Sequence, residues 1–133
     1  MDVASAVARP IEIEARGLCY TRGSRVIMDG LSCVFPRGRI SVLAGPSGSG
    51  KTTLLRMIAC LIQPDRGAIR IDGEADVAQM GAGALRAFRR RVGMLFQGGA
   101  LLDSMSVFDN VALPLREHSE LGEAQIRDEV HRV

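Results

Sequence analysis

One run of eight residues has the types and the spacing to hold phosphate groups. It follows the pattern G-x-x-x-x-G-K-[ST] and consists of Gly45, Pro46, Ser47, Gly48, Ser49, Gly50, Lys51 and Thr52. Glycines let the backbone turn tightly and bring its N–H groups close to phosphate oxygens. Lys51 is expected to reach the β- and γ-phosphates, and the Thr52 hydroxyl is expected to bind Mg²⁺. The alternative is a Gly/Ser-rich turn with an incidental lysine.

The segments on both sides give this run the strand–loop–helix setting that the pattern needs. Residues 40–44 are apolar apart from Ser41, which predicts a strand over 39–44 that is buried on both faces. Apolar residues recur at helical spacing after the loop, which predicts a helix over 51–62. The positive end of that helix would attract phosphate. Thr53, in its first turn, is included among the phosphate-binding candidates.

Composition limits the other functions open to the chain. It has 133 residues, 47% of them hydrophobic, which is enough for one domain with a core. A net charge of +2 gives no argument for nucleic acid, and the absence of Trp argues against a base-stacking surface. Three cysteines without a C-x-x-C pattern predict free, mostly buried thiols rather than a metal site. No apolar stretch is long enough to predict a membrane-spanning helix, and the N-terminus does not look like a signal peptide.

Periodicity predicts several further elements. Strands are expected over 11–20, over 26–35 with a bulge or bend at Asp29-Gly30, over 68–73, and over 92–96 with Gln97 at its end. Helices are expected near Gly81, after a capping box that begins at Ser106, and near 120. Pro114 is expected to limit or kink the second of these helices.

The order of these motifs resembles the nucleotide-binding domain of ABC transporters. The residues that carry the resemblance are the loop GPSGSGKTTLL, the Pro-Asp-x-Gly loop at 64–67, the Ile-x-Ile-Asp-Gly strand at 69–73 and Phe96-Gln97. The resemblance implies an α/β P-loop NTPase fold, truncated, with an antiparallel β subdomain and the start of a helical subdomain. Residues 93–101 and 107–117 look most like Mla-type ATPases, which energise phospholipid transport between bacterial membranes.

This resemblance also implies a domain layout. Residues 1–10 would be a variable N-terminal segment, and residues 11–133 the N-terminal part of one ABC ATP-binding domain. Within that part, the P-loop core would lie at 38–63, the Q-loop near 97 and the start of the helical subdomain at 98–133.

Two further site assignments come from the resemblance. Gln97 looks like the Q-loop glutamine of the family. In the family, this glutamine contacts Mg²⁺ and the attacking water, and it links the ATP site to the transmembrane partner. The alternative is a glutamine that simply ends a strand. The family stacks adenine on an aromatic residue at the position that Arg22 occupies here. Either Tyr20 or Arg22 is therefore assigned to the base, because a guanidinium plane also stacks on a ring. Tyr20 packed under the small sheet is an equally good interpretation.

The implied cofactors are ATP and Mg²⁺, and the implied partners are a transmembrane permease subunit and a second ATPase subunit. The subunit would lie on the cytoplasmic face of the inner membrane. The LSGGQ, Walker B and switch-histidine elements of the family do not occur in the sequence. We therefore expect nucleotide binding with negligible hydrolysis by this chain alone. A catalytically inactive nucleotide-binding or permease-docking module is the alternative, and a P-loop kinase or GTPase fits less well.

The charged residues outside these motifs have ordinary explanations. The acidic residues not placed by a motif are predicted to be loop and cap residues, and the arginine cluster to be a solvated helix face. The acidic residues are Asp72, Glu74, Asp103 and Asp109, and the arginines are Arg86, Arg89, Arg90 and Arg91.

Overall fold

The computed structural model describes residues 12–73 and 76–133. The predicted N-terminal segment 1–10 and Glu74 lie outside the described residues. The chain divides into two compact units, one ending at Val92 and one running from Gly93 to Val133, and each is described by itself.

The first unit is built on a three-stranded antiparallel sheet. Its strands are β1 (Ile13–Arg22), β2 (Arg25–Phe35) and β3 (Arg66–Ile71), in the order β2-β1-β3. A two-residue turn joins β1 to β2, so that Arg22 lies opposite Arg25. The predicted bulge at Asp29-Gly30 is confirmed, because Leu18 pairs with Leu31 and Tyr20 with Met28.

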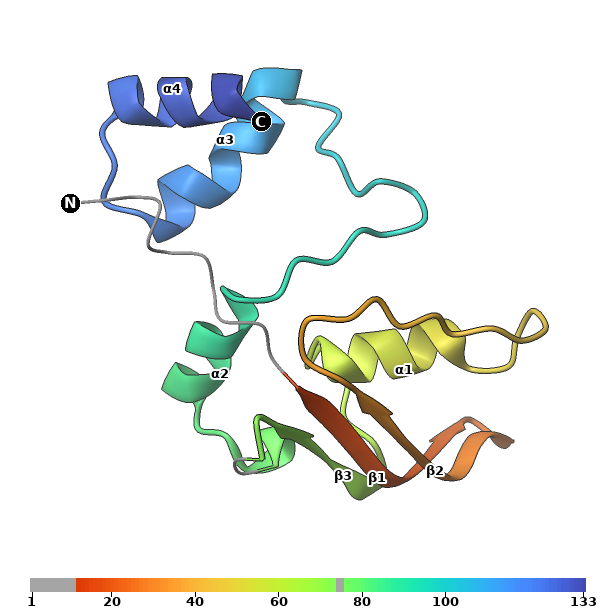
Figure 1. The fold of residues 1–133 in the computed structure, drawn as a ribbon. Helices are drawn as coiled ribbons and strands as arrows, with labels where there is room; N and C mark the ends of the chain where they lie inside the picture. The colour runs from red at the N-terminus through yellow and green to blue at the C-terminus, as the bar shows by residue number, and fades with distance from the viewer. Residues whose placement is uncertain (1–11, 74–75) are drawn as a thin grey trace. The chain divides into compact units, whose positions relative to one another are not determined.

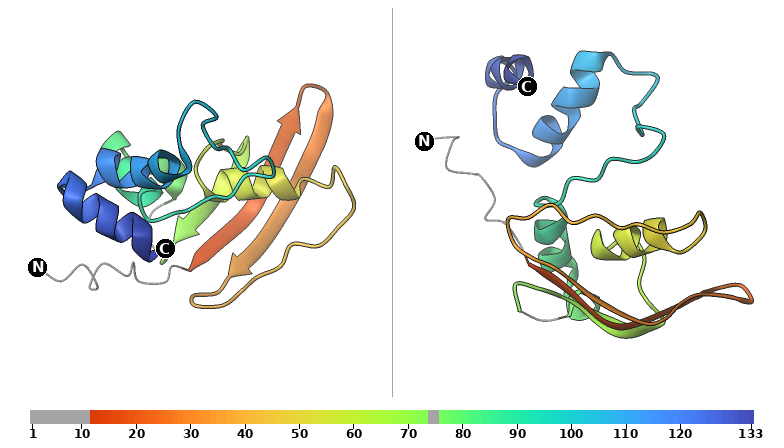
Figure 2. Two further views of the ribbon diagram at one scale, coloured as in Figure 1. Left: turned by 90° about the horizontal axis from the view of Figure 1, so that it is seen from above. Right: turned by 45° about the vertical axis from the view of Figure 1, so that its right-hand side comes forward.

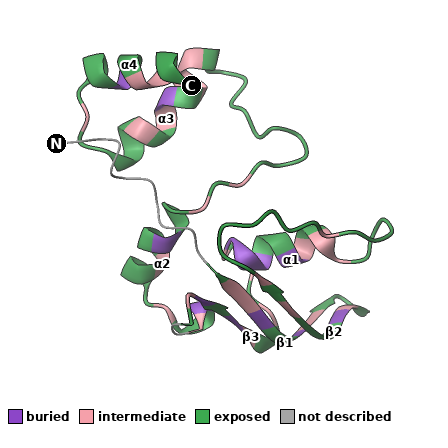
Figure 3. Cartoon of the chain, viewed as in Figure 1, coloured by how far each residue is buried: buried purple, intermediate pink, exposed green. Residues whose placement is uncertain are grey.

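Helices cover one face of this sheet (Figures 1 and 2). They are α1 (Lys51–Ile58), the short 3-10 helix η2 (Val77–Gln79) and α2 (Ala82–Arg89). The helices bury their apolar side chains against those of the sheet, and Figure 3 shows the buried positions on α1, α2 and the strands. The core consists of Ala15, Leu18, Met28, Leu54, Met57, Ile58, Ile69, Ile71, Val77 and Phe88. This core anchors the start of α1, which carries the candidate phosphate-binding residues.

Helix α1 is shorter than the sequence predicts, and its end has a local cause. Cys60 adopts a left-handed conformation with φ 56°. Its N–H bonds to the Met57 carbonyl, and the Leu61 N–H bonds to the Arg56 carbonyl at 2.8 Å. This pair of bonds is a Schellman motif, which ends the helix at Ile58 rather than at Ile62. The side chain of Arg89 donates to the Cys60 carbonyl at 2.6 Å and so ties α2 to this end.

Two predicted strands are wrong. Residues 39–44 and 92–96 form no strand. A strand is maintained by hydrogen bonds to a neighbouring strand, and no described segment pairs with either stretch. Instead of being buried, Ile40 is 97% and Val42 83% exposed.

The second unit is a pair of helices, α3 (Val107–His118) and α4 (Glu123–Arg132), which follow an irregular segment. The predicted cap is confirmed: the Ser106 hydroxyl accepts the Asp109 N–H at 3.0 Å. Helix α3 continues past Pro114 to His118, so the proline does not end it. Ala112 and Ile126 are the buried residues of the two helices.

Two general features of the described residues bear on function. None of their helices has both the length and the apolar character needed to cross a bilayer. All three cysteines, Cys19, Cys33 and Cys60, are free thiols, and each is half-buried. Burial raises the pKa of the Cys33 and Cys60 thiols, which makes both thiols less reactive.

Candidate nucleotide-binding site

The glycine-rich run forms a loop that leads directly into α1. Gly48 has φ 78° and Gly50 has φ 91°, conformations that side chains other than glycine rarely adopt. Gly50 is the N-cap of α1, and its carbonyl accepts the Leu54 N–H at 2.9 Å. The unpaired N–H groups of the first helical turn therefore follow immediately on the loop, in the arrangement that binds an anion.

The Lys51 side chain bends back over the loop. Its ammonium donates to the carbonyls of Gly45 at 2.8 Å and Pro46 at 2.7 Å. An ammonium has three N–H donors, and the third has only a long contact of 3.4 Å to the Ser49 hydroxyl. Two carbonyls thus fix the position of the charge, while the remaining donor can turn to a phosphate oxygen without breaking them.

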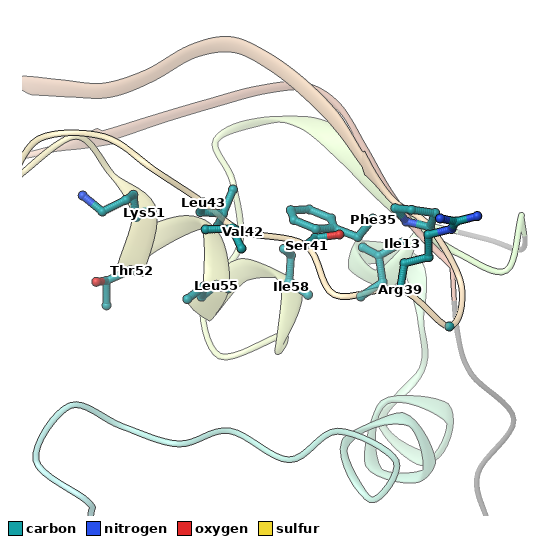
Figure 4. A pocket seen from close by; sticks show the side chains of 12 residues that line it. Ile13, Phe35, Arg39, Ser41, Val42, Leu43, Lys51, Thr52, Leu55 and Ile58 are labelled. Carbon is teal, nitrogen blue, oxygen red and sulfur yellow. The ribbon is translucent and has the colours of Figure 1, made fainter.

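Thr52 lies beside Lys51 at one end of a cleft of about 620 Å³ (Figure 4). The segment 39–43 forms one wall of the cleft, and α1 contributes Leu55 and Ile58 to the other. The Thr52 residue is exposed. Its hydroxyl is thus accessible at the edge of the loop, as a ligand for a metal ion must be.

Strand β2 supports the loop from the side. A side-chain carbon added to Gly50 would lie 3.0 Å from the Ile27 Cγ2 atom and 3.4 Å from the Ile27 carbonyl oxygen. Met28 is in similar contact, at 3.5 Å. An added side chain would therefore crowd the Ile27 side chain, so glycine is favoured here for space as well as for φ.

The two residues assigned to the base differ in exposure. Tyr20 is half-buried and packs against the hydrophobic core. Arg22 is exposed at the end of β1. The geometry favours the interpretation in which Tyr20 packs under the sheet, and of the two it leaves Arg22 as the side chain accessible to a ligand.

Sequence reasoning missed Arg25. A side-chain carbon at Gly48 would lie 3.7 Å from the Arg25 Nη2 atom, so this guanidinium borders the phosphate loop. No motif marks Arg25, since it reaches the loop only through the register of the β1–β2 hairpin.

Gln97 belongs to the second unit and stands in an exposed turn, closed by a 2.8 Å bond from the Gly99 N–H to the Phe96 carbonyl. It does not end a strand, as the sequence predicts, because residues 92–96 form none. Its role at a nucleotide therefore stays a prediction.

The described residues supply a phosphate cradle, a fixed ammonium and an accessible hydroxyl within one short stretch of chain. Such an arrangement neutralises and orients a phosphate chain, which is what phosphoryl-transfer proteins of the P-loop class require. Fold and loop together define a P-loop nucleotide-binding domain of the ATP-binding-cassette type. A family model for ABC transporters matches residues 28–133, and the chain belongs to that family.

Curated relatives confirm the likeness to Mla-type ATPases. The intermembrane phospholipid transport system ATP-binding protein MlaF of Escherichia coli K12 is 51% identical over 109 residues, 82% of this chain and 40% of its own length. MlaF of Haemophilus influenzae is 47% identical over 115 residues, 86% of this chain and 43% of its own length. A probable ribonucleotide transport ATP-binding protein of Mycobacterium bovis is 44% identical over 118 residues, 89% of this chain and 33% of its own length. The chain thus spans less than half of each of these relatives.

Solved structures confirm the predicted fold class. A dimeric, post-hydrolysis state of an ATP-binding cassette bound to ADP and Pi matches with a TM-score of 0.78 at 25% identity, covering 90% of this chain and 54% of that one. A dimeric bacterial ABC transporter cassette matches with a TM-score of 0.77 at 27% identity, covering 87% of this chain and 53% of that one.

Proposed function

We propose that this chain is part of the ATP-binding subunit of an ABC transporter that moves phospholipid between bacterial membranes. The observation that carries the proposal is the 51% identity to MlaF, which spans the phosphate loop and the segment that follows it. The proposal includes the layout predicted above, with the P-loop core at 38–63 and a helical subdomain from 98.

At the site, the loop from Gly45 to Thr53 would hold the phosphates of ATP. Lys51 would donate to the β- and γ-phosphates while its two carbonyl contacts keep it in place. Thr52 fits the role of magnesium ligand, because its residue is exposed beside Lys51 at the start of α1. Mg²⁺, when bound, neutralises charge on the phosphate oxygens. Gln97 would be a second ligand of that ion, and Arg22 would stack on the base.

Several partners follow from this assignment. The segment 98–116 would dock a transmembrane permease at the cytoplasmic face of the inner membrane. It presents exposed apolar residues for such a contact, among them Leu101 and Val107, which are 69% and 83% exposed. A second ATPase subunit would complete the site, as both solved cassettes are dimeric.

Because the LSGGQ and Walker B elements do not occur in the sequence, the chain alone would bind ATP without appreciable turnover.

Calorimetric titration of ATP into the chain, with and without Mg²⁺, tests the binding step. We expect binding that Mg²⁺ strengthens and that Lys51→Ala weakens at least tenfold, since the variant removes the one charge fixed inside the loop. Arg56→Ala, on the last turn of α1, is the matched control for loss of a positive charge. Equal affinity of the Lys51→Ala variant and the unchanged chain would overturn the proposal.

Two further measurements test the remaining parts. We expect phosphate release from ATP to be no faster with the chain than without it, and turnover that Lys51→Ala abolishes would contradict this. Co-expression with an Mla-type permease, followed by purification in detergent, tests docking. Recovery of a complex that Leu101→Asp and Val107→Asp disrupt is the expected result, with Val34→Asp on the sheet as control.

A further inference from the structure

The end of the β1–β2 hairpin brings two like charges together. Arg22 and Arg25 are direct cross-strand partners, and both are exposed. Like charges directly opposite each other destabilise a pair of strands. Among the described residues, the side chain of neither arginine forms a salt bridge or hydrogen bond. Asp65, which lies close by, uses its carboxylate to accept the Thr21 N–H at 2.7 Å. Neither guanidinium therefore has an ion-pair partner among the described residues.

The hairpin places one of the two charges at the phosphate loop. The Arg25 Nη2 atom is 3.7 Å from where a Gly48 side chain would begin. Ile27 and Met28 of the same strand contact the loop at Gly50, so packing holds this part of β2 beside the loop, and the exposed Arg25 side chain extends from it. The strand is irregular at this point: Tyr20 pairs with Met28 but the next residue, Thr21, pairs with Val26, so Ile27 is an extra residue in a bulge.

We propose that Arg25 is a phosphate-binding residue, which adds a second cation to the one that Lys51 supplies. A guanidinium offers five N–H donors in a planar fork that matches phosphate oxygens, and it remains charged at every relevant pH. The contact recognises the phosphate chain and carries no information about the base. It deepens the proposed function and rests on it, because the ligand is the same nucleotide.

Competition titrations with three ligands test this assignment: ATP, GTP and inorganic tripolyphosphate, each added to the full chain and to Arg25→Ala. We expect the variant to bind all three about 3- to 10-fold more weakly, the range of an exposed charge-assisted contact. The loss should shrink as salt is raised from 0.05 to 0.5 M, because mobile ions screen exposed charges. Arg25→Lys should recover part of the affinity, since it restores the charge without the fork.

Two controls make the outcomes decisive. Arg56→Ala removes a positive charge from the far end of α1 and should leave all three affinities within twofold. An Arg25→Ala loss confined to ATP and GTP would show a base contact and overturn the proposal, as would unchanged affinity for all three. Loss of binding in Lys51→Ala tests the proposed function independently of Arg25. The proposed function can therefore be supported even if the result for Arg25→Ala contradicts the role of Arg25. If the unchanged chain binds none of the ligands, both fail.

Discussion

At the scale of single residues, Gly50 is the point at which the phosphate loop packs against strand β2. Its φ of 91° places it in the left-handed region, and a side-chain carbon would lie 3.0 Å from Ile27. We expect Gly50→Ala to destabilise the chain by roughly 1–3 kcal/mol, through backbone strain and crowding against β2. ATP affinity should fall as well, because the loop must move away from the strand. Thermal unfolding and calorimetric titration of the variant measure both effects.

Gly83 provides the matched control for that substitution. It lies within α2, its φ is not positive, and an added carbon would meet nothing within 4 Å. Gly83→Ala should therefore stabilise the chain by about 0.5–1 kcal/mol and leave ATP binding unchanged. Equal stability of the two alanine variants would contradict the role given to Gly50.

The site residues also show how far sequence alone reaches. Gly45 to Thr52 could be found because each loop role needs a particular residue type at a fixed spacing. Arg25 could not be found, since it reaches Gly48 through the path of β2, which depends on the bulge between Val26 and Met28 as well as on the turn. Tyr20 shows the opposite case: its residue type suggested a base contact, but its side chain is half-buried and packs against the core.

At the scale of elements, prediction succeeded where a residue type marks the cause and failed where none does. Helix α3 begins where Ser106 predicts, because a cap is one side chain bonding to the backbone three residues on. The end of α1 depends on Cys60 in a left-handed conformation, which non-glycine residues rarely adopt and no pattern predicts. Residues 39–44 have the composition of a buried strand, but a strand also needs a hydrogen-bonding partner, which composition cannot guarantee.

Arg116 joins α3 to α4 by ion pairs. Arg116 donates two bonds to Glu123, at 2.9 and 3.0 Å, and one to Asp109 at 2.8 Å. Its guanidinium holds the pKa of both carboxyls below their usual range, with the Ser106 hydroxyl adding to the effect at Asp109. Groups whose pKa is lowered by folding stabilise the folded state above their unfolded pKa and lose that contribution as the pH falls.

We therefore expect the hairpin to be fully formed at neutral pH and to loosen in acid, as Asp109 and Glu123 become protonated below their ordinary pKa range of about 4. Amide NMR signals of α3 and α4, followed in the full chain from pH 7 to pH 2, measure this transition. In Arg116→Ala the helices should already be looser at pH 7, with little further change in acid. Arg132→Ala is the control, because Arg132 pairs with Glu129 inside α4 and links no second helix. A pH response that is the same in both variants would exclude Arg116 as the link.

At the scale of the whole molecule, several large apolar side chains of the described residues are exposed to solvent. Ile40 and Val42 are 97% and 83% exposed in the first unit, and Leu95 is 88% exposed in the second. Side chains of this kind associate when nothing covers them, and extended apolar backbone without a neighbour can pair with another chain.

This exposure predicts concentration-dependent self-association of the chain. Replacing Ile40 and Val42 together by threonine keeps the β-branched shape but adds a hydroxyl to each side chain, so the double variant should stay monomeric to higher concentration. Sedimentation velocity over a range of protein concentrations measures the change, and ATP titration verifies that the loop is intact. Val34→Thr is the control, because Val34 is 54% exposed but lies within the paired strand β2. If that control reduces association as much as the double variant does, general surface hydrophobicity accounts for it, and the unpaired segment 39–44 has no special part.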